Sequence, residues 1–339
     1  MKYVSPSVEI IEQGPGIEGM LKHIELAGRV CYKSEAQITE DSAQKFFDRM
    51  IASGHLSVLE HGTIYLAVPI GSPVRDNGFT WKTSIINFFQ NNAYSNVTRE
   101  QVIEDVQISS KNVKLTTPVT YDIYYVTTNM RVIIENANNK VIYYNLDKSI
   151  QDNLETSCLS FMTEPEARHI KRYSVKIINT DIGVTRDFNR HRSLSPSEQS
   201  TRFCDYCNDK KFDSGISFCT PIWLSTDDCD ALDSNKISFE ELCKKVLDGD
   251  QLSAVEYYAF ANYAAEYSYS NLRKLDWKPE QARKVLPLGT FSSVVYTGSI
   301  LAWQHFFDLR ALGTTGKPHP ECQELAQHIM NLFKDRNYF

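Results

Sequence analysis

The sequence lacks the charge balance and composition that mark several large classes of protein. Its 339 residues include 36 Lys and Arg against 42 Asp and Glu, so the net charge is −6. A chain-wide attraction to nucleic acid or to an anionic membrane is therefore not expected. No low-complexity tract, internal repeat or linker rich in Pro, Gly and Ser divides the chain. Any anion that this protein binds has to be held by a local cluster of side chains.

The cysteines form neither a disulfide framework nor a metal site. The eight of them are spread thinly, and the CxxC pair Cys204 and Cys207 has no second pair at zinc-finger spacing. The N-terminal residues include acidic side chains and lack the apolar stretch of a signal peptide. We therefore expect reduced thiols, no bound metal and a cytoplasmic location.

Residues 285–307 form an uncharged run that is as long as a membrane-spanning helix. It contains proline, glycines, several hydroxyl residues, Gln304 and His305, so it is too polar to be a bilayer helix. We predict instead a helix over about 290–309 that is buried on several sides, either in a soluble core or at a subunit interface.

Hydrophobic periodicity predicts an α+β fold in which helices dominate the second half of the chain. Helices are predicted at 39–53, 152–169, 183–190, 238–275, 279–285 and 320–334, and strands at 63–69, 119–126, 141–144, 173–180 and around 216–223. Residues 70–112 are polar, rich in asparagine and without a clear period, so they are predicted to form a long loop. Residues 131–136 fit a strand or a helix equally well.

The densest polar cluster spans residues 185–202 and holds four arginines but no lysine. A guanidinium group binds phosphate in a planar two-point geometry that lysine cannot offer. Arg186 and Arg190 lie one helical turn apart, and Ser200 and Arg202 alternate as they would along an extended loop. These residues predict a phosphate-binding loop, and the alternative is a solvated basic turn on the surface.

Within this cluster, RHRSLSPSEQSTR (190–202) is similar to the signature of the flavin-dependent thymidylate synthases, which is Arg-His-Arg, seven residues and then serine. The segments GHLSVLEH (54–61), CDYCNDKKFDSGISFCTPIWL (204–224) and the 282–310 run, which begins ARKVLPLGTF and ends in LR, also resemble that family. The resemblance covers about 40–69 and 172–331. It implies a single domain over 1–339, with a mixed or antiparallel sheet, long helices and an insertion at 70–171 relative to compact members.

This resemblance implies reductive methylation of dUMP to dTMP. Methylenetetrahydrofolate would donate the carbon unit, NADPH would supply the hydride through FAD, and no cysteine nucleophile would take part. The family also implies a homotetramer whose active sites are shared between subunits. No G-x-G-x-x-G motif followed by a helix is present, so the sequence does not decide whether NADPH has a pocket of its own.

The resemblance also assigns site residues. The dUMP-binding set is Asp187, Arg190, Glu198, Gln199, Ser200, Thr201, Arg202, Arg283 and Arg310. The FAD-binding set is Ser57, Arg190, His191, Arg192, Glu198, Ser299 and His305. Two further residues, His55 and Glu60, are assigned to the folate side. Arg310 is the catalytic residue, because a guanidinium beside the pyrimidine favours the ionised ring and makes its C5 more nucleophilic.

Simpler interpretations stand beside these assignments. Arg310 could end a helix favourably through its charge, and His61 could be a packed or capping histidine. Asp187, Ser299 and Leu301 depart from the residues that some family members carry there. An alternative function is therefore a nucleotide-binding relative without turnover. An RNA- or DNA-binding module is disfavoured by the acidic excess.

Overall fold

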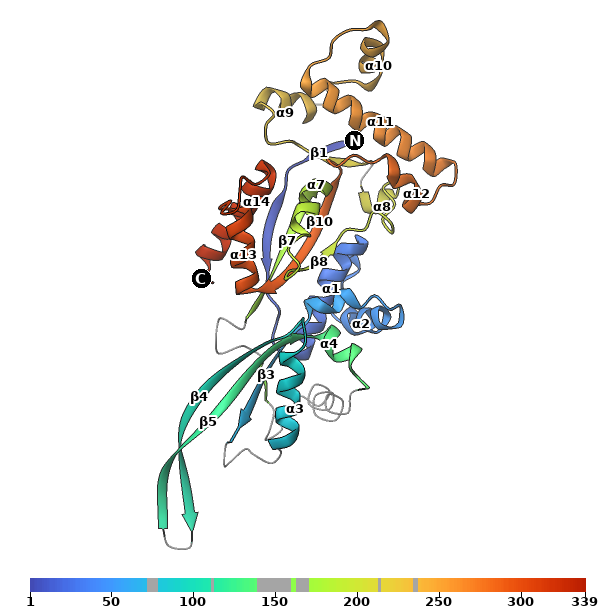
Figure 1. Ribbon diagram of the computed structural model, residues 1–339. Coiled ribbons are helices and arrows are strands. Elements are labelled where there is room, and N and C mark those ends of the chain that lie inside the picture. Colours follow the sequence, from blue (N-terminus) through green and yellow to red (C-terminus); the bar gives the residue numbers. More distant parts are fainter. Residues whose placement is uncertain (72–78, 111–112, 139–159, 163–170, 213–214, 234–236) are drawn as a thin grey trace.

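The computed structural model describes residues 1–71, 79–110, 113–138, 160–162, 171–212, 215–233 and 237–339. Figure 1 shows an elongated molecule with helices α9, α10 and α11 at one end, a sheet with flanking helices in the middle and a long two-stranded ribbon, β4 and β5, at the other end. The α+β class predicted from the sequence is confirmed.

The central sheet is antiparallel and has the order β2-β7-β10-β8. Its strands are β2 (Ser7–Ile11), β7 (Arg172–Asp181), β8 (Ser195–Glu198) and β10 (Phe291–Ser299). Helices α13 (Ile300–Arg310) and α14 (Pro320–Asp335) pack on one face, where Val294 and Tyr296 join their core. Helix α1 (Gly16–Tyr32) packs on the other face against Val295. Strand β10 is therefore covered on both sides.

The second sheet is also antiparallel, with the order β4-β5-β3-β6. Its strands are β3 (Thr63–Ile70), β4 (Asn96–Ser110), β5 (Val113–Asn129) and β6 (Ser160–Met162). Helices α2 (Ser42–Ala52), α3 (Phe79–Gln90) and α4 (Met130–Glu135) lie beside it, with the 3₁₀ segments η1 (Glu35–Gln37) and η2 (Leu56–His61) between α1 and β3. Strand β3 pairs with the end of β5, which in turn pairs with the start of β4. The rest of the β4–β5 pair projects from the sheet as a ribbon (Figure 1).

The remaining elements are a short strand pair and several helices. Strand β1 (Lys2–Val4) pairs in parallel with β9 (Ser217–Cys219). The helices are α7 (Ile182–Phe188), α8 (Asp209–Phe212), α9 (Thr226–Asp233), α10 (Phe239–Asp248), α11 (Ala254–Lys274) and α12 (Pro279–Ala282), which continues into η5 (Arg283–Val285). Helix α11 begins at a capping box in which Ser253 and Glu256 satisfy each other's backbone N–H groups.

Two predictions from periodicity are wrong. The run predicted as a helix over 290–309 begins as strand β10 and becomes helical only at Ile300. A strand buried on both faces carries no alternation, so its uncharged sequence looks like that of a buried helix. Residues 70–112 contain α3 and β4 rather than one long loop. Strand β4 is held by its ladder with β5, a long-range interaction that leaves no local period.

Other predictions fall partly outside the described residues. The strand at 141–144 lies outside them, as does most of the helix at 152–169, within which Ser160–Met162 is strand β6. The ambiguous segment 131–136 belongs to helix α4, whose start is capped by the side chain of Asn129. Within the parts of the chain that the structure describes, no helix is long and apolar enough to cross a membrane.

A buried polar chain lies where the two sheets meet. Nε2 of His23 is 2.8 Å from Oγ of Ser174, which is 2.6 Å from Oγ1 of Thr297, which in turn is 2.7 Å from Nδ1 of His61. His61 is thus a packed histidine, the simpler of the two interpretations of this residue. Burial lowers the pKa of His23 to about 4 and that of His61 well below its ordinary value. Both rings are neutral in the folded protein.

We expect acid to destabilise the fold through these histidines. An unfolded histidine takes up a proton near pH 6.5, whereas His23 in the folded chain stays neutral down to about pH 4. The unfolded state therefore binds more protons in that window, and the free energy of unfolding should fall as the pH falls through it. Urea unfolding at several pH values between about 7 and about 4.5 measures this slope.

A pair of variants separates this cause from general acid effects. His23→Leu should reduce the slope of the free energy of unfolding against pH by the equivalent of up to one proton, because the titrating ring is gone. Ser174 keeps its hydrogen bond to Thr297 in this variant. His328→Asn alters an exposed histidine and should leave the slope unchanged. Equal slopes in the His23→Leu variant and the original protein would contradict the assignment.

Candidate functional site

The arginine-rich loop is held between a helix and an edge strand. Helix α7 begins at Asp181, whose carboxylate accepts a hydrogen bond of 2.6 Å from the backbone N–H of Val184. Strand β8 then pairs with β10, so that Glu198 lies opposite Val294. Beyond the strand, the N–H of Gln199 donates to the carbonyl of Ser293 and that of Ser200 to the carbonyl of Cys31. The backbone of the signature is therefore fixed by two neighbouring elements.

A cleft of about 640 Å³ opens beside this backbone. Five of the nine residues assigned to dUMP line it, namely Glu198, Gln199, Ser200, Thr201 and Arg283. Arg283 comes from η5, more than eighty positions along the chain, and its Nη1 donates to Oγ1 of Thr201 at 3.0 Å. The structure therefore brings together two segments that the sequence connects only by resemblance.

Two side chains in the cleft have contrasting hydrogen bonding. Glu198 accepts hydrogen bonds from Thr185 (2.8 Å), Ser292 (3.0 Å) and Asn189 (3.2 Å), so its carboxylate is held in one orientation. Gln199 is 3% exposed, and its Oε1 has no hydrogen-bond partner among the described residues. Its Nε2 donates to the hydroxyl of buried Tyr206 at 3.5 Å, so the amide is directed into the core.

Arg310 forms a second group with two other assigned residues. Its Nε donates to Nε2 of His191 at 2.9 Å, and its Nη2 donates to the carbonyl oxygen of Asp187 at 2.7 Å. Burial and the adjacent guanidinium lower the pKa of His191 to about 4, so the ring is neutral and its Nε2 can accept. The Arg310 side chain keeps 17% of its surface exposed and is available to a ligand.

The other assigned residues lie outside the cleft. Arg190, Arg192, Ser57 and His305 are exposed. Arg190 approaches the Asp187 carboxylate only to 3.9 Å, and the His305 ring lies 6.0 Å from that of His191.

Two of the assigned residues have protein partners instead. Arg202 is exposed and pairs with Glu280 at 3.2 Å, and Ser299 caps helix α13 by accepting from Ala302. These side chains do not form one site within a single described chain.

The two residues assigned to the folate side have different surroundings. Glu60 is buried and pairs with Arg131 at 2.6 Å, which makes it part of the scaffold. His55 hydrogen-bonds Tyr32 and contacts the half-exposed ring of Phe203. It also borders a hollow of about 340 Å³ lined by the cations Arg49 and Lys211.

Several lining residues were not assigned from the sequence. Thr185, Arg186 and Cys31 also line the cleft. Arg186 could have been found from the sequence, because it lies one turn before Arg190 in the arginine cluster. Cys31 comes from the end of α1, and no sequence pattern pointed to it. Burial raises the pKa of the Cys31 thiol to about 11, so it is a weak nucleophile. No group of three or more His, Cys, Asp and Glu able to hold a metal occurs in the described residues.

The neutrality of His191 can be tested directly. In an NMR titration of its ring protons, the folded protein should give a pKa of about 4. Arg310→Met removes a nearby positive charge and should raise that pKa, while Arg99→Met, on strand β4, should not. A ring that titrates near 6.5 in the unaltered protein would contradict the hydrogen bond from Arg310.

Comparison with known proteins gives a family and a distant likeness of fold. Among curated proteins, none matches the chain. The crystal structure of a UMP/dUMP methylase PolB from Streptomyces cacaoi bound with 5-Br dUMP is similar at 14% identity, over 99% of this chain and 93% of that one, with a TM-score of 0.39. The same methylase bound with 5-Br UMP is similar at 14% identity, over 99% of this chain and 92% of that one, with a TM-score of 0.40. These values are too low to support an argument about substrate.

The family match is extensive. The family model described as thymidylate synthase complementing protein matches residues 119–336. The match includes the arginine signature at 190–202 and the 282–310 run, although 54–61 lies outside it. Because it spans well over half of the sequence and contains the residues that line the cleft at β8 and η5, the chain belongs to the family of thymidylate synthase complementing proteins.

Proposed function

We propose that this protein is a flavin-dependent thymidylate synthase, which converts dUMP to dTMP with methylenetetrahydrofolate as carbon donor and NADPH as reductant through FAD. The observation that carries the proposal is the cleft in which residues 198–201 of the signature meet Arg283. Family membership supports the same activity.

The nucleotide phosphate is proposed to bind at Arg283, Ser200 and Thr201. Arg283 already donates to Thr201, and Arg186 adds a second guanidinium to the same cleft. A phosphate group would accept from both arginines and from the hydroxyls.

Arg310 is proposed to activate the pyrimidine. Its Nε and Nη2 are occupied by His191 and by the Asp187 carbonyl, and its Nη1 lies 4.0 Å from the Asp187 carboxylate. These contacts fix the plane of the guanidinium. Positive charge placed against the ring stabilises negative charge there and makes C5 a better nucleophile. His191, held neutral, positions the guanidinium without adding a competing charge.

The chain offers groups that fit the phosphates of a flavin cofactor. Arg192 is exposed and forms no ion pair among the described residues, and Arg190 has only a distant carboxylate neighbour. Both are free to meet a diphosphate, and Ser57 and His305 are exposed as well. FAD, when bound, would supply the hydride that completes the methyl group.

The folate is proposed to bind near His55. Arg49 and Lys211, which line the hollow beside it, would suit the carboxylates of the folate glutamate. Glu60 is proposed as scaffold rather than as a ligand, because Arg131 holds it.

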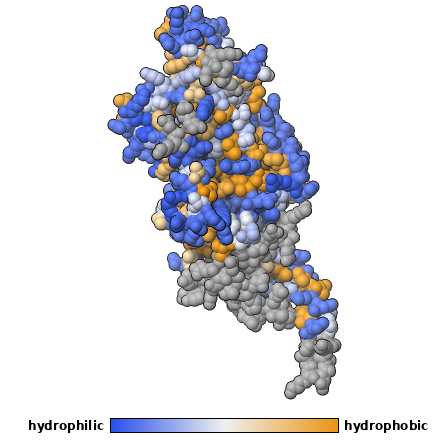
Figure 2. Space-filling model, turned by 180° about the vertical axis from the view of Figure 1, so that it is seen from behind, coloured by the Kyte–Doolittle hydropathy of each residue, from blue (hydrophilic) through white to orange (hydrophobic). Residues whose placement is uncertain are grey.

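A homotetramer is proposed to complete the sites. The exposed arginines need a partner surface if they are to enclose cofactor and nucleotide. Figure 2 shows an apolar band across the middle of the rear face of the molecule, bordered by polar surface. Large exposed apolar side chains such as Leu288, Leu301 and Trp223 are typical of surfaces that another subunit covers.

The activity test uses purified protein supplied with FAD. It should be yellow, and it should oxidise NADPH and form dTMP only when dUMP and methylenetetrahydrofolate are present. Arg310→Ala should keep the flavin but lower turnover by about two to three orders of magnitude. Arg99→Ala, on strand β4 of the second sheet, is the matched control and should retain full turnover. Binding of dUMP without flavin or turnover would favour the non-catalytic alternative.

A cysteine variant tests the absence of a covalent nucleophile. Cys31 is the thiol that lines the cleft. Because its pKa is raised by burial, Cys31→Ala should keep turnover within about threefold. Loss of turnover in a folded Cys31→Ala protein that still binds dUMP and flavin would point to nucleophilic attack by the thiol instead.

A further inference from the structure

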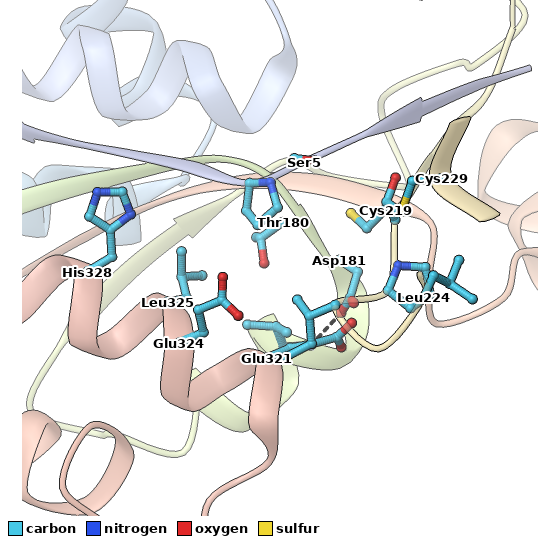
Figure 3. A pocket seen from close by; sticks show the side chains of 15 residues that line it. Ser5, Thr180, Asp181, Cys219, Leu224, Cys229, Glu321, Glu324, Leu325 and His328 are labelled. Atoms are coloured by element: carbon cyan, nitrogen blue, oxygen red, sulfur yellow. Dashed lines mark hydrogen bonds between the residues drawn. The ribbon is translucent and has the colours of Figure 1, made fainter. Parts of the chain in front are cut away.

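A second cavity lies on the side of helix α7 away from the nucleotide cleft. It has a volume of about 270 Å³ and lies between the start of α7, the segment after β9, the end of β1 and helix α14. None of the residues assigned to dUMP, FAD or folate lines it. Figure 3 shows it from close by.

Three carboxylates from two elements border this cavity. Asp181 comes from the end of β7, and Glu321 and Glu324 lie on successive positions of one face of α14. Figure 3 shows them directed toward the same space. Among the described residues no lysine or arginine lines the cavity. One histidine, His328, lines it, and another, His319, lies 3.9 Å from Glu321. The carboxylates therefore have no permanently charged Lys or Arg as counter-ion among the described residues that line the cavity.

Thr180 adds an independent feature. The side chain is 1% exposed and lines the cavity, yet no hydrogen bond to its hydroxyl is found in the described part of the chain. Figure 3 shows it pointing into the space above Glu324. Buried hydroxyl groups are normally hydrogen-bonded, so this one indicates a polar ligand.

The electrostatic surroundings fit the same conclusion. Burial raises the pKa of Asp181, and burial followed by the Asp181 charge raises that of Glu321. Two carboxylates that disfavour each other's ionised form gain stability when a positive group is placed between them. No Lys or Arg from the described part of the chain lines this cavity to act as that positive group.

The rest of the lining indicates which kind of cation would fit. Val184, Ile222, Leu224 and Leu325 give the cavity apolar walls, which a hydrated metal ion would not contact favourably. In addition, no group suited to a metal ion is found within the described ranges. The volume is near the lower end of the range of about 300–1,000 Å³ for small-molecule sites, so the ligand has to be small.

We propose that this cavity binds a small aliphatic ammonium ion, whose N–H groups donate to Asp181, Glu321 and the Thr180 hydroxyl while its alkyl chain contacts the apolar walls. The three N–H donors of a primary ammonium match these three acceptors in number. Glu324, exposed at the mouth, attracts the cation as it enters. This site does not depend on the proposed thymidylate synthase activity.

The test is calorimetric titration of the full chain near neutral pH, without nucleotide or flavin. The probe is n-butylammonium, and 1-butanol is its neutral counterpart of similar shape. The ammonium should bind saturably at one site per chain, and the alcohol should bind at least about tenfold more weakly because it lacks the charge. Equal binding of the two probes, or no saturable binding of the ammonium, would overturn the proposal.

Variants locate the binding. Glu321→Gln should weaken butylammonium binding by about tenfold or more, and Thr180→Val, which keeps the shape of the side chain, by a few-fold. Asp335→Asn removes a carboxylate from the far end of α14 and should change nothing. Because Thr180→Val leaves every charge in place, it serves if Glu321→Gln fails to fold. Unchanged affinity in a folded Glu321→Gln or Thr180→Val variant would contradict the proposed contacts.

Discussion

The arrangement of the two four-stranded sheets depends on how Arg172 joins them. This residue begins β7, and its guanidinium donates to the Glu60 carbonyl in η2 at 2.8 Å and to the Thr297 carbonyl in β10 at 3.4 Å. Its backbone N–H donates to the hydroxyl of Tyr65 in β3. Among the described residues it forms no ion pair with a carboxylate, so these directional bonds satisfy the group instead. Segment η2, which contains Ser57 and directly follows His55, is thereby fixed relative to β8 and the signature.

Strand β10 connects the hydrogen bonds of Arg172 to the cleft. Its two faces pack against α1 and against α13 and α14, while its hydroxyl and carbonyl groups hold the adjacent site residues. Ser292 donates to Glu198, and the carbonyl of Ser293 accepts from Gln199. Strand β10 therefore determines where the carboxylate and the amide of the cleft lie. The small hydroxyl residues of this strand fit both tasks, because they are compact enough for the core and still form hydrogen bonds.

The sequence predicted those parts of the structure that depend on neighbouring residues. The periodic helix α2, the strand β7 and the residues of the cleft at 198–201 and Arg283 follow from local pattern and from the signature. By contrast, β10 was predicted as helix because burial on both faces removes the alternation that identifies a strand. Strand β4 was not predicted because it is held by its hydrogen bonds to β5, which leave no periodic pattern in its own sequence. The bond between Arg310 and His191 joins residues 119 positions apart, and no spacing rule predicts it.

The polar chain between the sheets has a consequence for the protonation of its ends. Four atoms, one on each of His61, Thr297, Ser174 and His23, are joined by three hydrogen bonds. The two hydroxyls contribute two protons, so the third has to come from one of the neutral rings. When one imidazole donates into the chain, the other must accept from it. His61 enters the chain through Nδ1 and His23 through Nε2, so both rings carry the same tautomer, with the proton either on both Nδ1 atoms or on both Nε2 atoms. Neither ring can exchange its tautomer unless both hydroxyls and the distant ring reverse with it.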